Sequence, residues 1–255
     1  MFKMNKLQLF SATALLMLCS TLASATPLTV AVAANVKYAF DELAVDFKNE
    51  TGIEVQGVFS SSGKITAQVK NGAPFDIFIS ADTEFPEALY KDGLAATQPK
   101  VYAYGVLVLW TTKDLDLTKG LSLLTDTRVQ KIAIANPKVA PYGRAAMQAL
   151  ESAKLNAAVE SRLVYGESIT QTTQFVDSGA ADIGFIAKSI VLAPELAGKG
   201  KWVEAPKGSY EPIAQAVVVL KHGAETQSES ARKFVDFLFT PKARAIFEKY
   251  GYVLP

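Results

Sequence analysis

The chain repeats one local arrangement four times: an apolar strand runs into a few small polar residues, which then open a helix. The clearest copy is Phe59 to Ile65, where three serines and a glycine separate a strand pattern from a helix pattern. The first N–H groups of a helix have no partner within it, and the helix dipole is positive at that end. One such junction predicts only an N-cap, because serine is a preferred capping residue. Four of them facing one place would form a site for an anion.

The other three junctions vary in sequence but keep this order. Asn35 ends the first strand, residues 136–143 follow a strand at 131–135, and residues 166–168 follow a strand at 161–165. Apolar strands that alternate with helical periodicity predict an α/β fold with sheets covered on both faces. Ligands of such sheets bind beyond the carboxyl ends of the strands. A site between two lobes would therefore gather all four helix starts.

The predicted organisation is two lobes, because the chain has two junctions in its first part and two in its second. Two long apolar runs, residues 106–111 and 213–220, lie where the chain would cross from one lobe to the other and return. We expect residues 26–105 with 212–255 to form one lobe and residues 106–211 to form the other. The expected strands are residues 28–34, 53–59, 75–79, 106–111, 131–135, 161–165, 181–187 and 213–220.

The first 25 residues have the pattern of a secretory signal peptide. Lys3 and Lys6 precede an apolar run from Leu7 to Leu18, and Ala23 to Ala25 is typical of a cleavage site. That run is too short to span a bilayer. We therefore expect cleavage after Ala25 and a periplasmic location.

Composition argues against several functional classes. Residues 1–25 contain two lysines and no acid, so their removal leaves 24 basic and 25 acidic residues and no electrostatic footprint for nucleic acid. Removal also takes Cys19, the only cysteine, and with it any disulfide or thiolate nucleophile. The one histidine, His222, follows an apolar strand, where a solvated turn is expected. We expect a monomer with no cofactor.

Several segments together resemble the periplasmic molybdate-binding proteins, which are receptors of ABC importers. The matching pieces are residues 33–35, 59–62, 72–82, 136–143 and 247–252. The resemblance covers the whole mature chain. It implies the two-lobed fold of type II periplasmic binding proteins, with a mixed sheet flanked by helices in each lobe and the ligand in the cleft between them. It also implies a receptor, not an enzyme, that passes molybdate or tungstate to an inner-membrane ABC permease.

In this family, side-chain donors and backbone N–H groups from both lobes hold the oxyanion, and no residue binds the metal directly. Some members have a serine where this chain has Asn35, and a ligand-contacting tyrosine where it has Ala187. We expect Tyr142 to supply that contact. Carried over by position, the ligand-binding residues are Asn35, Ser62, Tyr142 and Ile169, with Ala34, Ser61 and Ser168 as secondary candidates.

Two alternatives stay open at this point. Neutral donors recognise charge and shape before they recognise an element, so a receptor for sulfate or another tetrahedral oxyanion is the first. The second is a secreted phosphate- or sulfate-ester hydrolase with Ser61 or Ser62 as nucleophile, although no base lies near in sequence. A site of donors should reject phosphate, which carries a proton near neutral pH and needs an acceptor. Glu167, one residue before the Ser168 cap, is the acid that could accept this proton, and we expect it to face solvent.

Overall fold

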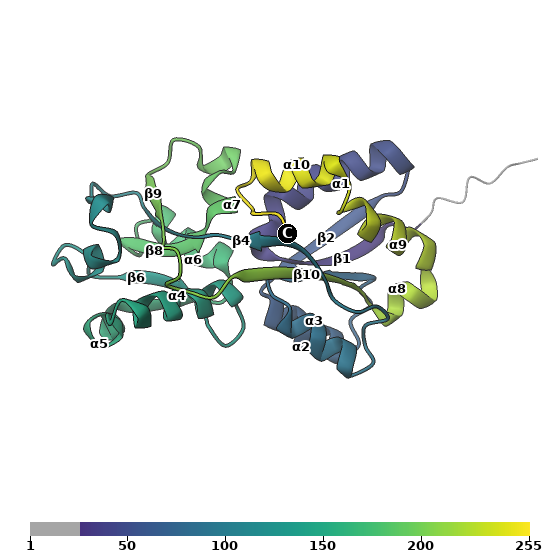
Figure 1. The fold of residues 1–255 in the computed structure, drawn as a ribbon, viewed down its shortest axis with the longest axis horizontal. Coiled ribbons are helices and arrows are strands. Elements are labelled where there is room, and N and C mark those ends of the chain that lie inside the picture. Colours follow the sequence, from purple (N-terminus) through teal and green to yellow (C-terminus); the bar gives the residue numbers. More distant parts are fainter. Residues whose placement is uncertain (1–25) are drawn as a thin grey trace, which may run out of the picture.

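The computed structural model describes residues 26–255, so the predicted signal peptide lies outside the described residues. Two five-stranded mixed sheets, each flanked by helices, form two lobes side by side (Figure 1). The predicted two-lobed α/β fold is confirmed. The first lobe has strand order β2-β1-β3-β10-β4, and the second has β7-β6-β8-β5-β9.

In the first lobe, helices cover both faces of the sheet because the strand residues alternate between two cores. Val30 and Val32 pack with Phe40 and Phe234 on one face, and Ala31 packs on the other. The strands are β1 (Leu28–Ala33), β2 (Val55–Ser60), β3 (Ile77–Ile79), β4 (Lys100–Gly105) and β10 (Ile213–Val219). The helices are α1 (Lys37–Thr51), α2 (Ser62–Lys70), α3 (Glu84–Lys91), α8 (Lys221–Thr226), α9 (Ser228–Phe237) and α10 (Pro241–Lys249).

The second lobe has the same layered plan. Its central strands β6 and β8 are fully buried, and α4 and α6 pack against them. The strands are β5 (Leu107–Thr111), β6 (Ile132–Ala135), β7 (Leu163–Gly166), β8 (Ile183–Ala187) and β9 (Lys201–Glu204). The helices are α4 (Pro141–Ser152), α5 (Asn156–Val159), α6 (Ile169–Asp177) and α7 (Lys188–Val191). The 3₁₀ segments of the described chain are η1 (Ala34–Val36), η2 (Leu117–Thr125), η3 (Glu160–Arg162) and η4 (Pro194–Leu196).

Several details differ from the sequence prediction. The strands expected to begin at residues 53, 75 and 181 each begin two residues later, and His222 lies in helix α8 and not in a turn. Strands β4 and β9 were not expected, and each is an edge strand of its sheet. The apolar residues of β4 stand just before the stronger run of β5, and β9 is mostly exposed. The strand expected at residues 161–165 begins instead at Leu163. Residues 160–162 form a 3₁₀ turn closed by the Leu163 N–H, which donates to Glu160 O, and Arg162 ties that turn to the Val129 carbonyl oxygen (2.7 Å).

The chain passes between the sheets twice, after β4 and after β9. The two passages are bonded together, since Ala205 N–H donates to Leu107 O (2.9 Å) and Leu107 N–H donates to the Tyr210 hydroxyl (3.1 Å). The first of these bonds continues the β5–β9 ladder of the second sheet. Within residues 26–255, no helix has both the length and the apolar character needed to cross a membrane.

Candidate anion-binding site between the lobes

Four helix starts, two from each lobe, converge on one small cavity. Segments η1 and α2 come from the first lobe, and α4 and α6 come from the second. Each follows the carboxyl end of a parallel strand, which is where such sheets bind ligands. The cavity is lined by Ala33, Ala34, Asn35, Ser61, Ser62, Ala81, Ala140, Pro141, Tyr142 and Ile169.

The backbone N–H groups at these helix starts are available to a ligand. Over the described residues, the N–H groups of Ser62, Tyr142 and Ile169 donate to no protein acceptor. Each lies in the first turn of its helix, where no intrahelical acceptor exists. Pro141, at the start of α4, has no N–H to satisfy. The cavity therefore combines free donors with the positive ends of several helix dipoles.

Ser61 has the most informative side chain at the cavity. It occupies the N-cap position of α2, yet its hydroxyl makes no capping bond. Its Oγ is buried and has no hydrogen-bond partner, and the residue as a whole is 4% exposed. Buried hydroxyls are almost always paired. An unpaired one that lines a cavity indicates that a ligand completes the site.

Ser62 also directs a donor at the cavity. Its Oγ accepts a hydrogen bond from the Ala81 N–H (3.0 Å), so its own proton is left for another acceptor. The expected site residue is therefore in place. Ser61, expected only as a secondary candidate, lines the cavity beside Ser62.

Asn35 lines the cavity, but its side-chain donors point away from it. Nδ2 donates to Gln215 Oε1 (2.9 Å) and to the Tyr252 hydroxyl (3.0 Å). The Asn35 carbonyl oxygen accepts from the hydroxyls of Tyr252 (2.9 Å) and Ser189 (2.7 Å). Asn35 is thus locked in a buried polar network, and its backbone N–H is the group it can offer to a ligand.

Tyr142 enters the cavity from the second lobe. Its hydroxyl accepts a hydrogen bond from Gln215 Nε2 (3.2 Å) in the first lobe. Burial raises the pKa of Tyr142 well above the ordinary tyrosine value, so the phenol stays protonated. Ala187, where some relatives were expected to have a tyrosine, is buried at the end of β8 and does not line the cavity.

Two residues near the start of α6 do not face the cavity. Ser168, a secondary candidate, is the N-cap of α6, and its hydroxyl accepts from the Gln171 N–H (3.3 Å). It is therefore a structural cap and does not line the cavity. Glu167 pairs instead with Lys64 (2.8 Å), and its side chain is largely exposed. The expectation that it faces solvent is confirmed.

The lobes are closed over the cavity. Gly63 N–H in the first lobe donates to Val139 O in the second (2.9 Å). A side chain at Gly63 could not be accommodated, because a Cβ there would lie 2.8 Å from the Val139 Cα. The Lys64–Glu167 pair also joins the lobes. The cavity is consequently a chamber whose walls come from both lobes, and these contacts hold the two walls together.

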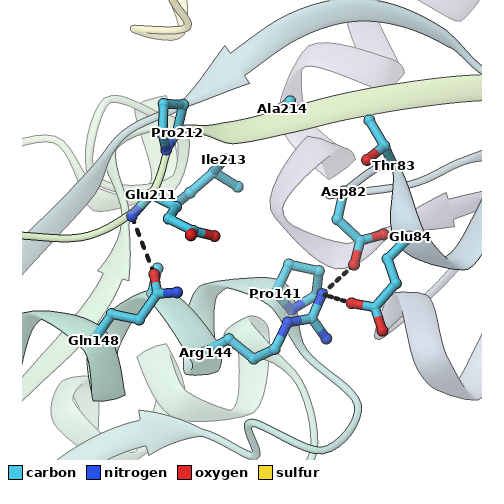
Figure 2. A pocket seen from close by; sticks show the side chains of 11 residues that line it. Asp82, Thr83, Glu84, Pro141, Arg144, Gln148, Glu211, Pro212, Ile213 and Ala214 are labelled. Atoms are coloured by element: carbon cyan, nitrogen blue, oxygen red, sulfur yellow. Dashed lines mark hydrogen bonds and ion pairs between the residues drawn. The ribbon is translucent and has the colours of Figure 1, made fainter.

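A larger cavity of about 550 Å³ lies beside this chamber, also between the lobes (Figure 2). Arg144, one turn along α4 from the chamber, pairs there with Asp82 and with Glu84 (3.3 Å). Burial raises the pKa of Asp82 against the opposing effect of the Arg144 charge. The guanidinium is therefore already neutralised by carboxylates, and this cavity is not a second anion site.

Comparison with known proteins defines the class to which this fold and chamber belong. Residues 28–253 match the family described as bacterial extracellular solute-binding proteins, and the chain belongs to that family.

Individual relatives of the chain carry more specific names than the family does. The chain is 40% identical to the molybdate-binding protein ModA of Azotobacter vinelandii over 91% of this chain and 92% of that protein. It is 39% identical to ModA of Rhodobacter capsulatus over 95% and 94% of the two chains. The solved periplasmic molybdate-binding protein of A. vinelandii superposes with a TM-score of 0.83 at 36% identity, over 89% of this chain and 99% of that one. The resemblance drawn from the sequence is confirmed.

Proposed function

We propose that this protein is a periplasmic receptor that captures molybdate and delivers it to an inner-membrane ABC permease. The family supports a solute-binding role, and two relatives at about 40% identity are named as molybdate-binding proteins. The observation that carries the proposal is the unpaired Ser61 hydroxyl in a chamber of helix starts. A fully ionised tetrahedral oxyanion satisfies that hydroxyl and the free N–H groups around it.

The proposed ligand contacts come from both lobes. From the first lobe they are the hydroxyls of Ser61 and Ser62 and the backbone N–H of Asn35. From the second lobe they are the backbone N–H of Ile169 and Tyr142, the latter with its hydroxyl in addition. The anion is held by hydrogen bonds to its oxygens, so the metal atom has no direct protein ligand.

A hydrolase is disfavoured by the surroundings of the serines. His222 bonds Asp76 (2.9 Å) just before β3, at the amino end of that strand, whereas the chamber lies at the carboxyl ends. Within residues 26–255, no histidine or carboxylate is hydrogen-bonded to the Ser61 or Ser62 hydroxyl. Those residues also contain no cluster of three metal-ligating side chains. The proposal accordingly includes no catalytic step and no cofactor.

The remaining parts of the proposal concern the mature protein. We propose that it is cleaved after Ala25 and acts as a monomer, and that it accepts tungstate as well as molybdate because the two oxyanions present the same charge and tetrahedral shape.

The test is isothermal titration of the purified mature protein with molybdate, tungstate and sulfate. Molybdate is expected to bind at one site and to raise the melting temperature in a concentration-dependent way. Small-angle scattering should show compaction, since the site is complete only when the lobes close. Tight binding of sulfate without binding of molybdate would replace the proposed ligand. An absence of binding to all three anions would overturn the function.

A further inference from the structure

A buried glutamine lies behind the chamber and bonds two of the residues that line it. Gln215 has an exposed fraction of 0% and lies in the apolar strand β10, where the register with β4 shifts. Such irregularities redirect side chains and are frequent beside functional sites. A fully buried amide is tolerated only when it is hydrogen-bonded. The partners of Gln215 therefore explain why a polar residue occupies this strand.

The three hydrogen bonds of Gln215 fix which way its amide faces. Oε1 accepts from Asn35 Nδ2 and from the Tyr102 hydroxyl, both at 2.9 Å. Nε2 donates to the Tyr142 hydroxyl at 3.2 Å. Rotating the amide by half a turn would set Nε2 against the Asn35 Nδ2 donor and break that bond, whereas the Tyr102 hydroxyl also has Ser80 O within reach (3.3 Å). The NH₂ end is thus held toward Tyr142.

This orientation decides what the Tyr142 hydroxyl can do. Because the hydroxyl accepts from Gln215, its own proton is not used in that bond. Over residues 26–255 the structure gives that proton no acceptor. Tyr142 lines the chamber, where an oxyanion needs donors. A side chain that accepted from Tyr142 at the Gln215 position would instead take the proton away from the ligand.

The contact spans the lobes and depends on a glycine. Tyr142 belongs to the second lobe, whereas Gln215 and Gly105 belong to the first. A Cβ at Gly105 would lie 2.2 Å from the Tyr142 hydroxyl oxygen and 2.5 Å from Gln215 Nε2. The glycine therefore leaves the space that the Tyr142 hydroxyl occupies when the lobes close.

We propose that Gln215 is a positioning residue for oxyanion binding: in the closed form it donates to Tyr142, so that the Tyr142 hydroxyl proton is directed to the bound anion. This inference rests on the proposed receptor function and adds a residue that does not itself touch the ligand. It also makes the direction of the Tyr142 proton depend on closure, which couples lobe closure to ligand recognition.

The test is a double-mutant cycle of Gln215→Met and Tyr142→Phe, with affinity measured by titration with molybdate. Each single variant should bind about tenfold to a hundredfold more weakly, the range for one hydrogen bond to a charged acceptor. If Gln215 acts through the hydroxyl, the double variant should match Tyr142→Phe within about twofold. Multiplied losses in the double variant would overturn the inference.

A second cycle covers the case in which Gln215→Met fails to fold. Gly105→Ala places a methyl group against the Tyr142 hydroxyl, so it should weaken binding about tenfold in the wild-type background. In the Tyr142→Phe background the shortest of these contacts, 2.2 Å to the hydroxyl oxygen, is gone, while Gln215 Nε2 still lies 2.5 Å from the added methyl group. Gly105→Ala should therefore cost less there than in the wild-type background. Equal losses in the two backgrounds would contradict the role of the hydroxyl.

The control is Thr111→Val in β5, which removes a buried bond to the Asp182 carbonyl oxygen (2.6 Å). It should lower the melting temperature and leave the affinity within about twofold. Titration of the wild type separates a failure of the receptor function from a failure of the role of Gln215. No binding of molybdate or sulfate by the wild type would overturn the receptor function together with this inference. If the wild type binds and the affinity losses of Gln215→Met and Tyr142→Phe multiply in the double variant, only the role of Gln215 is overturned.

Discussion

Replacing Ser61 with alanine should have opposite effects on ligand binding and on the empty closed form. In that form the Ser61 Oγ is buried without a partner. A buried hydroxyl left unpaired costs roughly 1 to 3 kcal/mol. Ser61→Ala removes this cost, so the ligand-free variant should shift from open toward closed relative to the wild type.

The affinity should change in the other direction. When the anion is bound, the Ser61 hydroxyl is expected to donate to a charged acceptor, a bond worth about 1.5 to 3 kcal/mol. Losing it corresponds to roughly tenfold to hundredfold weaker binding. A residue that served only the fold would not combine a more compact free protein with a weaker complex.

Two measurements on the same protein check this prediction. Isothermal titration with molybdate gives the affinity, and small-angle scattering of the ligand-free protein gives its radius of gyration. The matched control is Ser209→Ala, because that buried serine lies outside the chamber and its hydroxyl already bonds Pro206 O (2.7 Å). The control should lose about 1 kcal/mol of stability and keep its affinity.

An affinity of Ser61→Ala equal to that of the wild type would refute the reasoning. It would mean that the unpaired Ser61 hydroxyl is a packing defect and that, of the serines at residues 60–62, only Ser62 contacts the anion. Weaker binding without compaction would refute only the estimated cost of closing over an empty chamber.

Three further predictions concern closure, selectivity and pH. Arg144→Gln should speed anion dissociation about fivefold, because it removes a partly exposed interlobe ion pair worth roughly 1 kcal/mol; unchanged stopped-flow rates would contradict this. Phosphate should compete at least about a hundredfold less well than sulfate near pH 7, since its P–OH finds no acceptor; equal competition in titrations would refute a site made of donors. The free energy of unfolding should fall above about pH 10, because the unfolded chain then loses tyrosine protons that buried Tyr102 and Tyr252, with raised pKa values, retain; urea titrations that show no decline would contradict it.

The sequence located residues that line the chamber where the signal is local. A strand, a small polar residue and a helix lie within a few positions of each other, so the junctions at Ser62, Tyr142 and Ile169 could be located directly. Their convergence followed from the rule that parallel strands bind ligands at their carboxyl ends. Ser168 shows the limit of that signal, because capping and ligand binding use the same residue type in the same place.

Contacts between distant segments could not be predicted in this way. Asn35 bonds Gln215 and Tyr252, which lie 180 and 217 positions further along the chain. Gln215 sits in an otherwise apolar strand, and one polar residue there does not indicate its partners. The edge strands β4 and β9 were missed because β9 is short and mostly exposed, while the apolar residues of β4 adjoin the stronger run of β5.

The return of the chain to its first sheet has a consequence for the order of folding. Strand β10 pairs with both β3 and β4, and Val217 lies opposite Ile79 although 138 positions separate them. The second sheet is contiguous in sequence and has no such requirement. During synthesis and export it can assemble as soon as it emerges, whereas the first sheet must wait for the end of the chain. A chain cut short before β10 would therefore retain one half of the chamber on a complete sheet and the other half on an incomplete one.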